Sequence, residues 1–258
     1  MKLHYEHYGN SDNPALVLLH GWGMNSQVWQ PLIEPLAQDF HLTLIDLPGL
    51  GASREYPQPY GRDAVIDALL AVAPAKASWI GWSLGGQLAL ALAAKAPERV
   101  ERLVMLASNP CFVQREGWSE GMSQDTYQGF AQALQQNAAK TLTRFIMLQV
   151  QGAEAARPCL KQLKAVLAAQ QEPATALAES LVLLEEDERL SLAQLAQPLL
   201  MLFGAEDQLV PAAAADACKA IRPETEIRVY AGAGHVPFLS HPEVLLADLL
   251  DFLQAGAS

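Results

Sequence analysis

Short apolar runs alternate with longer amphipathic stretches along this chain. Ala15–Leu19 is continuously apolar, which is typical of a strand buried on both faces of a sheet, whereas Leu3–Tyr8 alternates loosely and predicts an edge strand. The other predicted strands are His41–Ile45, Ala77–Ile80, Val100–Leu106, Pro198–Phe203 and Glu226–Tyr230. Helices are predicted between them at Asp63–Ala73, Gln87–Ala96, Ala212–Ile221 and Pro242–Leu253. This alternation predicts the α/β class, with a mostly parallel sheet flanked by helices.

One segment breaks the alternation. From about Cys111 to Arg189 the pattern predicts only helices, namely Thr126–Gln136, Ala138–Gln149, Ala153–Gln170 and Thr175–Leu184. A helical insertion in an α/β sheet is best placed over the carboxyl ends of the strands, where such folds bind ligands. We therefore expect a core formed by residues 1–110 and 190–258, with residues 111–189 as a helical cap, called the predicted cap below.

Composition narrows the class of function. The chain has 258 residues, 51% of them hydrophobic, and a net charge of −11, so we expect a globular protein that does not bind nucleic acid. No apolar run reaches transmembrane length, so no membrane partner is expected. Three scattered cysteines form neither a disulfide framework nor a metal pattern, which favours a reduced, cytoplasmic protein. We expect no metal and no other cofactor.

A candidate nucleophile lies between the strand ending at Ile80 and an alanine-rich helix. The sequence there is Gly81-Trp82-Ser83-Leu84-Gly85, a G-x-S-x-G pattern. At a sharp strand-to-helix turn, this pattern exposes a serine hydroxyl to a neighbouring base. Glycines are needed on both sides because a Cβ there would collide with backbone.

A serine of this kind is followed in the chain by an acid and then by a histidine. His235 lies in a Gly-rich loop after the strand ending at Tyr230, which favours it as the base over His241, at a helix start. Asp207 follows the strand ending at Phe203 in a G-x-x-D-x-x-V-P pattern and is the favoured acid, with Glu206 as the alternative.

Two backbone N–H groups should stabilise the developing oxyanion. Leu84 supplies one as the residue after the nucleophile, and Trp22 supplies the other by its position in the loop after Leu19. His20 in that loop is interpreted as structural. Asp46, in a Gly-rich turn at the same edge of the sheet, is expected to bind backbone.

These motifs carry a family resemblance. His20-Gly21-Trp22-Gly23, the Ser83 pentapeptide and the Asp207 and His235 loops resemble the α/β-hydrolase superfamily over the whole chain. Within it, the chain resembles BioH-type pimeloyl-[acyl-carrier protein] methyl ester esterases. The more specific marks are Leu19-His20-Gly21-Trp22-Gly23-Met24-Asn25, Trp79-Ile80-Gly81-Trp82-Ser83-Leu84-Gly85-Gly86, Ala107-Ser108-Asn109-Pro110-Cys111-Phe112 and Arg144-Phe145-Ile146-Met147-Leu148-Gln149.

The resemblance implies an activity. It implies hydrolysis of a methyl ester at the end of an acyl chain carried by acyl-carrier protein, which frees a carboxylate in biotin biosynthesis. It also implies small esters as side substrates. The substrate-binding residues that it implies are Trp22, Ser83, Leu84, Phe145, Ile146, Met147, Leu148, Gln149 and His235.

A basic cluster within the predicted cap agrees with an acidic partner. Residues 140–164 contain five basic side chains and only Glu154, a net charge of +4 in a chain of −11. We expect carrier-protein docking at Lys140, Arg144, Arg157 and Lys161 of this cluster, which ends at Lys164. Solvated helix positions without a partner are the alternative interpretation.

Other functions stay open at this point. One is a carboxylesterase for free short-chain esters, and another is a binding protein that kept the fold and lost catalysis. A lyase of the menaquinone pathway fits the two tryptophans and the cap motif less well. Dehalogenases and epoxide hydrolases of this fold carry Asp where this chain has Ser83, which argues against them.

Overall fold

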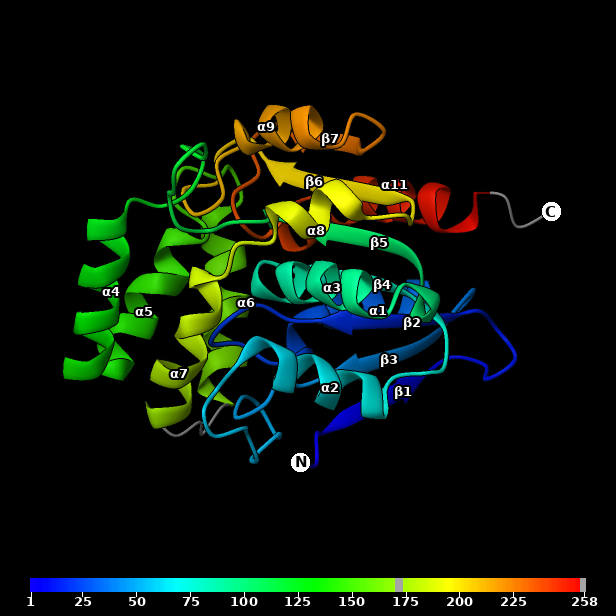
Figure 1. Ribbon diagram of the computed structural model, residues 1–258, viewed down its shortest axis with the longest axis horizontal. Coiled ribbons are helices and arrows are strands. Elements are labelled where there is room, and N and C mark those ends of the chain that lie inside the picture. Colours follow the sequence, from blue (N-terminus) through cyan, green and yellow to red (C-terminus); the bar gives the residue numbers. More distant parts are fainter. Residues whose placement is uncertain (170–173, 256–258) are drawn as a thin grey trace.

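The computed structural model describes residues 1–169 and 174–255, and its centre is a seven-stranded sheet (Figure 1). The strand order is β1-β3-β2-β4-β5-β6-β7; β1 is antiparallel to β3, and all other neighbours are parallel. The strands are β1 (Tyr5–Tyr8), β2 (Ala15–Leu19), β3 (His41–Ile45), β4 (Ala77–Trp82), β5 (Val100–Leu106), β6 (Leu199–Gly204) and β7 (Glu226–Tyr230). The predicted α/β class is therefore confirmed, and β1 lies at the edge.

Both faces of the sheet are covered by helices, because the inner strands are apolar on both sides. In β2, Val17 and Leu19 enter one hydrophobic cluster and Leu16 and Leu18 enter the other, as the two-residue period of a strand requires. The helices of the core are α1 (Gln30–Leu36), α2 (Arg62–Val72), α3 (Leu84–Lys95), α8 (Arg189–Gln194), α9 (Ala214–Ile221), α10 (Pro237–Ser240) and α11 (Pro242–Gln254). Short 3-10 helices are η1 (Ser26–Trp29), η2 (Pro97–Arg99) and η3 (Leu181–Glu185).

Among the described residues, the segment between β5 and α8 carries four further helices, which lie beyond the carboxyl ends of the parallel strands (Figure 1). They are α4 (Gln124–Gln136), α5 (Ala138–Leu148), α6 (Ala156–Ala168) and α7 (Ala174–Ser180). Side chains of Ser123 and Asn137 accept hydrogen bonds at the first turns of α4 and α5, as N-caps do. This placement agrees with an insertion that covers the edge of the sheet where ligands bind.

The element bounds differ from the predicted ones in a few places. The helix predicted for Ala153–Gln170 begins at Ala156, and position 170 lies outside the described residues. The helix predicted for Thr175–Leu184 is divided into α7 and η3. The short helices α1, α8 and α10 were not predicted.

The sequence analysis also predicted no disulfide framework and no transmembrane segment. Cys111, Cys159 and Cys218 are buried free thiols. Across the described ranges, no helix combines the length and apolarity needed to cross a bilayer.

Candidate active site

Ser83 occupies a strained turn between β4 and α3. Its φ of 55° and ψ of −121° are unusual for a non-glycine residue and cost about 1–3 kcal/mol, so the surroundings must impose them. The Ser83 N–H donates to the carbonyl of Leu106 at 2.9 Å, and the Ser108 hydroxyl donates to the Ser83 carbonyl at 2.8 Å. A Cβ at Gly81 would collide with the backbone of Gly85. The strand–turn–helix setting predicted for this serine is therefore present.

Asp207 and His235 face each other from the loops that follow β6 and β7. Asp207 Oδ2 lies 2.7 Å from His235 Nδ1, and both side chains are buried. The other oxygen, Oδ1, accepts the N–H groups of Leu209 at 2.8 Å and Val210 at 3.0 Å. Three hydrogen bonds therefore fix the carboxylate, and it orients the imidazole.

The two alternative residues lie elsewhere. The exposed Glu206 side chain lies beside Gly152, where a Cβ would be 3.8 Å from Oε2. His241 has its Nδ1 2.8 Å from the Ser240 hydroxyl, and its ring stacks on Tyr230 with centroids 6.2 Å apart. The structure thus pairs the favoured acid with the favoured base.

The histidine is held in a defined orientation. The backbone N–H of His235 donates to the carbonyl of Gln149 at 2.8 Å. Its backbone carbonyl accepts from Nε1 of Trp82, the residue before Ser83, at 2.8 Å. Because an ionised Asp207 can only accept, Nδ1 carries the proton and Nε2 keeps a lone pair. Nε2 is buried and has no protein partner within the described residues. It can therefore receive a proton from a hydroxyl group.

The two predicted oxyanion donors come from the start of α3 and from the loop after β2. Leu84 is the first residue of α3, so its N–H is one of the helix N-terminal donors without an intrahelical acceptor. Trp22 follows Gly21, where a Cβ would lie 3.2 Å from the Ser83 Cβ. The loop after β2 therefore runs directly past Ser83, as the predicted oxyanion role of Trp22 requires.

His20 holds that loop. Its Nε2 accepts the N–H of Leu47 at 2.9 Å, which leaves a proton on Nδ1 for the Gly21 carbonyl at 2.8 Å. Burial lowers the pKa of His20, and the nearby Asp46 carboxylate offsets part of that effect. Asp46 itself accepts the N–H groups of Ser26 and Ala52, each at 2.8 Å. Asp46 thus binds backbone as expected, and the contacts of His20 agree with a structural role.

The Trp22 side chain points into the predicted cap. Its ring contacts Phe130 of α4 and Phe145 of α5 edge to face, with centroids 5.4 and 5.2 Å apart. Phe145 was predicted at the site, whereas Phe130 was missed. The sequence does contain a signal for Phe130, because apolar residues three and four positions away from it mark an inward face of α4.

The remaining predicted substrate-binding residues of α5 do not share one environment. Phe145 and Ile146 are buried, whereas Met147 is 51% and Leu148 37% exposed. Gln149 is 1% exposed, and neither amide atom of its side chain has a protein partner within the described ranges. A helix turns by about 100° per residue, so five consecutive residues cannot all face one cavity. The structure brings Phe145 and Gln149 toward Trp22 and His235 and leaves Met147 and Leu148 on the outer surface.

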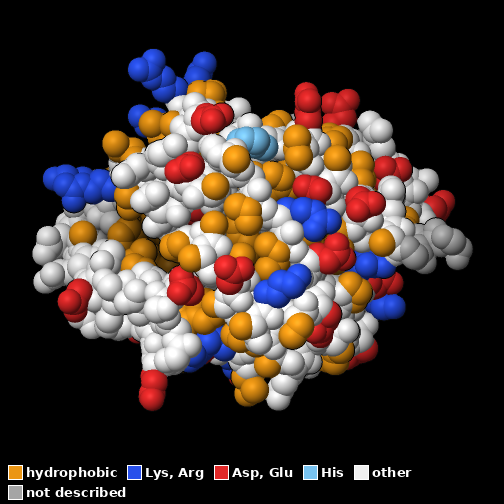
Figure 2. All heavy atoms as spheres, turned by 90° about the horizontal axis from the view of Figure 1, so that it is seen from above, with side chains coloured by type: hydrophobic (Ala, Val, Ile, Leu, Met, Phe, Trp, Pro, Cys, Tyr) orange, Lys and Arg blue, Asp and Glu red, His pale blue; other side chains and the backbone are white. Residues whose placement is uncertain are grey.

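The predicted docking residues are all exposed on α5 and α6. Lys140 and Arg144 lie on α5, and Arg157 and Lys161 lie on α6, which also carries Lys164. Figure 2 shows basic side chains projecting from the left part of the molecule, where Figure 1 places these helices. The structure thus presents this charge to solvent.

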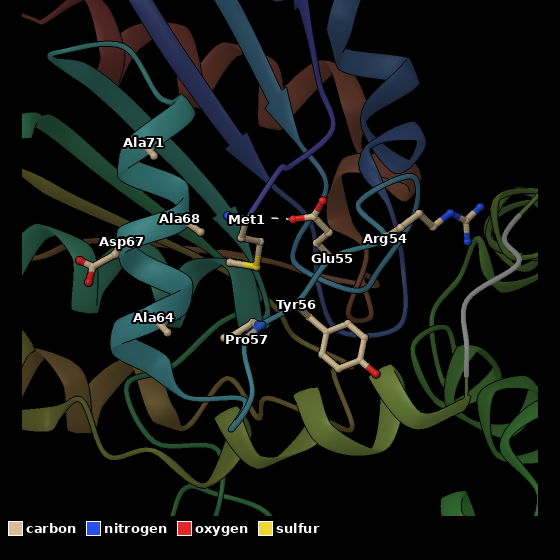
Figure 3. A pocket seen from close by; sticks show the side chains of 9 residues that line it. All are labelled: Met1, Arg54, Glu55, Tyr56, Pro57, Ala64, Asp67, Ala68 and Ala71. Carbon is tan, nitrogen blue, oxygen red and sulfur yellow. Dashed lines mark ion pairs between the residues drawn. The ribbon is translucent and has the colours of Figure 1, made fainter.

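A separate hollow of about 820 Å³ lies between α2 and the segment from Arg54 to Pro57, and the Met1 side chain enters it (Figure 3). It is lined by Met1, Arg54, Glu55, Tyr56, Pro57, Ala64, Asp67, Ala68 and Ala71. None of these is a predicted site residue, so this hollow is not the candidate active site.

Residues 14–242 match the family described as alpha/beta hydrolase fold, and the chain belongs to that family. The fold of an esterase from Exiguobacterium antarcticum agrees, with a TM-score of 0.87 at 20% identity over 98% of this chain and 96% of that chain.

Closer relatives identify the group within the family. The chain is 42% identical over 252 residues to the pimeloyl-[acyl-carrier protein] methyl ester esterase of Pectobacterium carotovorum, covering 96% of each chain. It is 43% identical over 250 residues to the esterase of that name from Pectobacterium atrosepticum, again covering 96% of each. The chain belongs to the family of these esterases.

Proposed function

We propose that this protein is a serine esterase that hydrolyses the methyl ester of pimeloyl-[acyl-carrier protein] and frees the terminal carboxylate in biotin biosynthesis. The observation that carries the proposal is the Asp207–His235 pair at the sheet edge that carries Ser83, in a chain 42% identical to esterases of that name. A cytoplasmic location is part of the proposal.

Ser83, His235 and Asp207 are the catalytic residues in this proposal. The Ser83 hydroxyl attacks the ester carbonyl while His235 Nε2 takes its proton, and Asp207 stabilises the resulting imidazolium. The carbonyl oxygen becomes an oxyanion that accepts the N–H groups of Trp22 and Leu84. The intermediate then collapses, His235 returns the proton to the methoxy oxygen, and methanol leaves.

Water completes the reaction. His235 removes a proton from a water molecule, whose oxygen attacks the acyl-Ser83 carbonyl. Collapse of the second tetrahedral intermediate returns the proton to Ser83 and releases the carboxylate. The reaction is balanced, because His235 passes the Ser83 proton to methanol in the first half and the water proton to Ser83 in the second, and no atom is oxidised or reduced.

The aromatic side chains of the predicted cap suit an aliphatic chain. Trp22, Phe130 and Phe145 meet above the loop that passes Ser83. Apolar surface of this kind stabilises a bound methylene group by about 0.8 kcal/mol. An acyl chain that lies along these rings would present its terminal ester to Ser83.

The basic cluster supports a carrier protein as the form in which the acyl chain arrives. The whole chain has a net charge of −11 and would repel an acidic partner, whereas the exposed positive charges on α5 and α6 attract one locally. A lysine acts as a point charge, whereas an arginine guanidinium can form two parallel hydrogen bonds to one carboxylate, so the residues will contribute differently to docking.

The test compares one acyl methyl ester in two forms, free and attached to carrier protein. Reversing Arg144 and Arg157 to Glu should raise KM for the carrier-bound form and leave a small chromogenic ester unchanged. Added salt should slow only the carrier-bound substrate, because the Debye length falls to about 3 Å at 1 M salt. Lys76→Glu, at the opposite end of the sheet, is the charge control for each single reversal, Arg144→Glu or Arg157→Glu.

Two results would change the proposal. Equal kcat/KM for the free and carrier-bound esters in the parent enzyme would favour the carboxylesterase for free short-chain esters. A KM for the carrier-bound ester that is insensitive to the Arg144 and Arg157 reversals would remove these two residues from the docking site.

A further inference from the structure

We propose that Ser180, on α7 of the predicted cap, is a positioning residue that holds the Trp22 indole and thereby sets the oxyanion-binding amide of Trp22. The inference rests on the role given to Trp22 in the proposed function. It makes the oxyanion site dependent on the predicted cap, and not on the core alone.

Three hydrogen bonds connect Trp22, Ser180 and Leu177. Trp22 Nε1–H lies 3.1 Å from Ser180 Oγ and 3.2 Å from the Leu177 carbonyl oxygen, so it is shared between two acceptors of α7. The Ser180 hydroxyl donates to the same Leu177 carbonyl at 3.2 Å, which leaves its lone pair free for the indole. Trp22, Leu177 and Ser180 are all buried, so these bonds do not compete with solvent.

Trp22 has little freedom to move independently of the predicted cap. Gly23 has a φ of 70°, and a Cβ there would lie 2.9 Å from Leu142 of α5 and 3.9 Å from Leu177 of α7. On the other side of Trp22, Gly21 packs against Ser83. Trp22 therefore lies between the nucleophile and the predicted cap, and a displacement of α7 would rotate it.

Such a rotation would affect catalysis directly. An oxyanion donor is effective at about 2.7–3.1 Å from the oxygen, so a small displacement of the Trp22 N–H weakens it. The carboxyl ends of the parallel strands, where this loop lies, are directed toward α4–α7 (Figure 1).

Not every buried indole of the chain has a protein acceptor among the described residues. Trp29 and Trp79 are buried, and their Nε1–H groups have no protein partner within the described residues. Trp22 and Trp82, which border the candidate active site, have acceptors, and so does Trp118, whose Nε1–H donates to the Cys111 carbonyl at 2.7 Å.

The experiment measures Ser180→Ala in the parent and in a Trp22→Phe background. The substrate is a small acetate chromogenic ester, which needs the oxyanion site and little of the acyl-binding surface. Loss of one neutral hydrogen bond predicts about a three- to tenfold decrease in kcat with KM unchanged. The affinity of an alkyl boronic acid, which forms a tetrahedral adduct on Ser83, should fall by the same factor. In the Trp22→Phe background, Ser180→Ala should have no further effect.

Two variants complete the design. Ser123→Ala removes another serine of the predicted cap, the N-cap of α4, and should leave turnover of the small ester unchanged. Ser180→Cys keeps the shape of the side chain with a somewhat larger atom and a weaker acceptor, so it should reduce kcat without opening a cavity.

The proposal is overturned if Ser180→Ala changes only KM for a long-chain ester, or if its effect on kcat persists in Trp22→Phe. The same holds if Ser180→Cys retains the parent kcat while Ser180→Ala does not. Failure of the proposed function is a separate result, namely ester hydrolysis that survives Ser83→Ala.

Discussion

Replacement of Asp207 by Asn should inactivate the enzyme by reversing the tautomer of His235. The two oxygens of Asp207 have different partners: Oδ1 accepts the N–H groups of Leu209 and Val210, and Oδ2 faces His235 Nδ1. An amide can place its oxygen at only one of these positions. If its NH₂ group faced Leu209 and Val210, two buried N–H donors would lose their acceptor, at about 1–3 kcal/mol each.

The amide of Asp207→Asn therefore keeps its oxygen toward Leu209 and Val210 and turns its NH₂ toward His235. Nδ1 must then accept, so the proton moves to Nε2, and His235 can no longer take a proton from Ser83. A tautomer reversal of this kind lowers kcat by about 10⁴-fold, or about 5.4 kcal/mol of transition-state stabilisation. The change is nearly isosteric, so the thermal midpoint should change little.

The assay is kcat for a small chromogenic ester, with thermal unfolding measured on the same samples. Glu206→Gln is the matched control: it makes the same chemical change on the neighbouring residue, whose side chain is exposed beside Gly152, and should leave kcat unchanged. A kcat for Asp207→Asn within tenfold of the parent would refute the reasoning. So would a larger loss in Glu206→Gln.

Three further outcomes are expected. Ser83→Ala should lower kcat by about 10⁶-fold with the fold intact. His235→Ala should lower it equally, because the two residues act as a unit. Ester hydrolysis by the purified variants checks both. Burial lowers the pKa of His20, so below pH about 6.5 the unfolded chain binds a proton that the folded chain excludes, and the free energy of unfolding should decrease until the pH reaches the lowered pKa. Urea titrations from neutral to acidic pH should show this decrease in the parent and a smaller one in His20→Gln.

The pattern of apolar residues predicted most of the core. The bounds of β2, β3, β5 and β7 agree with the predicted ones, because each is a compact run between clear breaks. Helix α1 was missed because it is short and contains Pro35 in its interior, which disfavours a helix in a local analysis. Tertiary packing, which a local pattern does not contain, stabilises it.

Site residues that directly follow a predicted strand could be predicted from the sequence. Site residues that come together only through the packing of distant segments could not. Ser83, Asp207 and His235 each follow a predicted strand, so parallel strands bring them to one edge. Ser180 lies 158 residues from Trp22 in the sequence, and no local signal connects them. The α5 run beginning at Phe145 was predicted as one lining surface, whereas the helical period divides it between inside and outside.

The most direct test of the central account is the intact mass of an acyl-carrier protein that bears the methyl pimeloyl chain, measured before and after incubation with the enzyme. The account predicts that the carrier loses one CH₂ in mass, because the methyl ester becomes a carboxylic acid while the chain stays attached. It also predicts no change with Ser83→Ala. An unchanged mass with the parent enzyme would contradict the account, as would release of the whole acyl chain from the carrier.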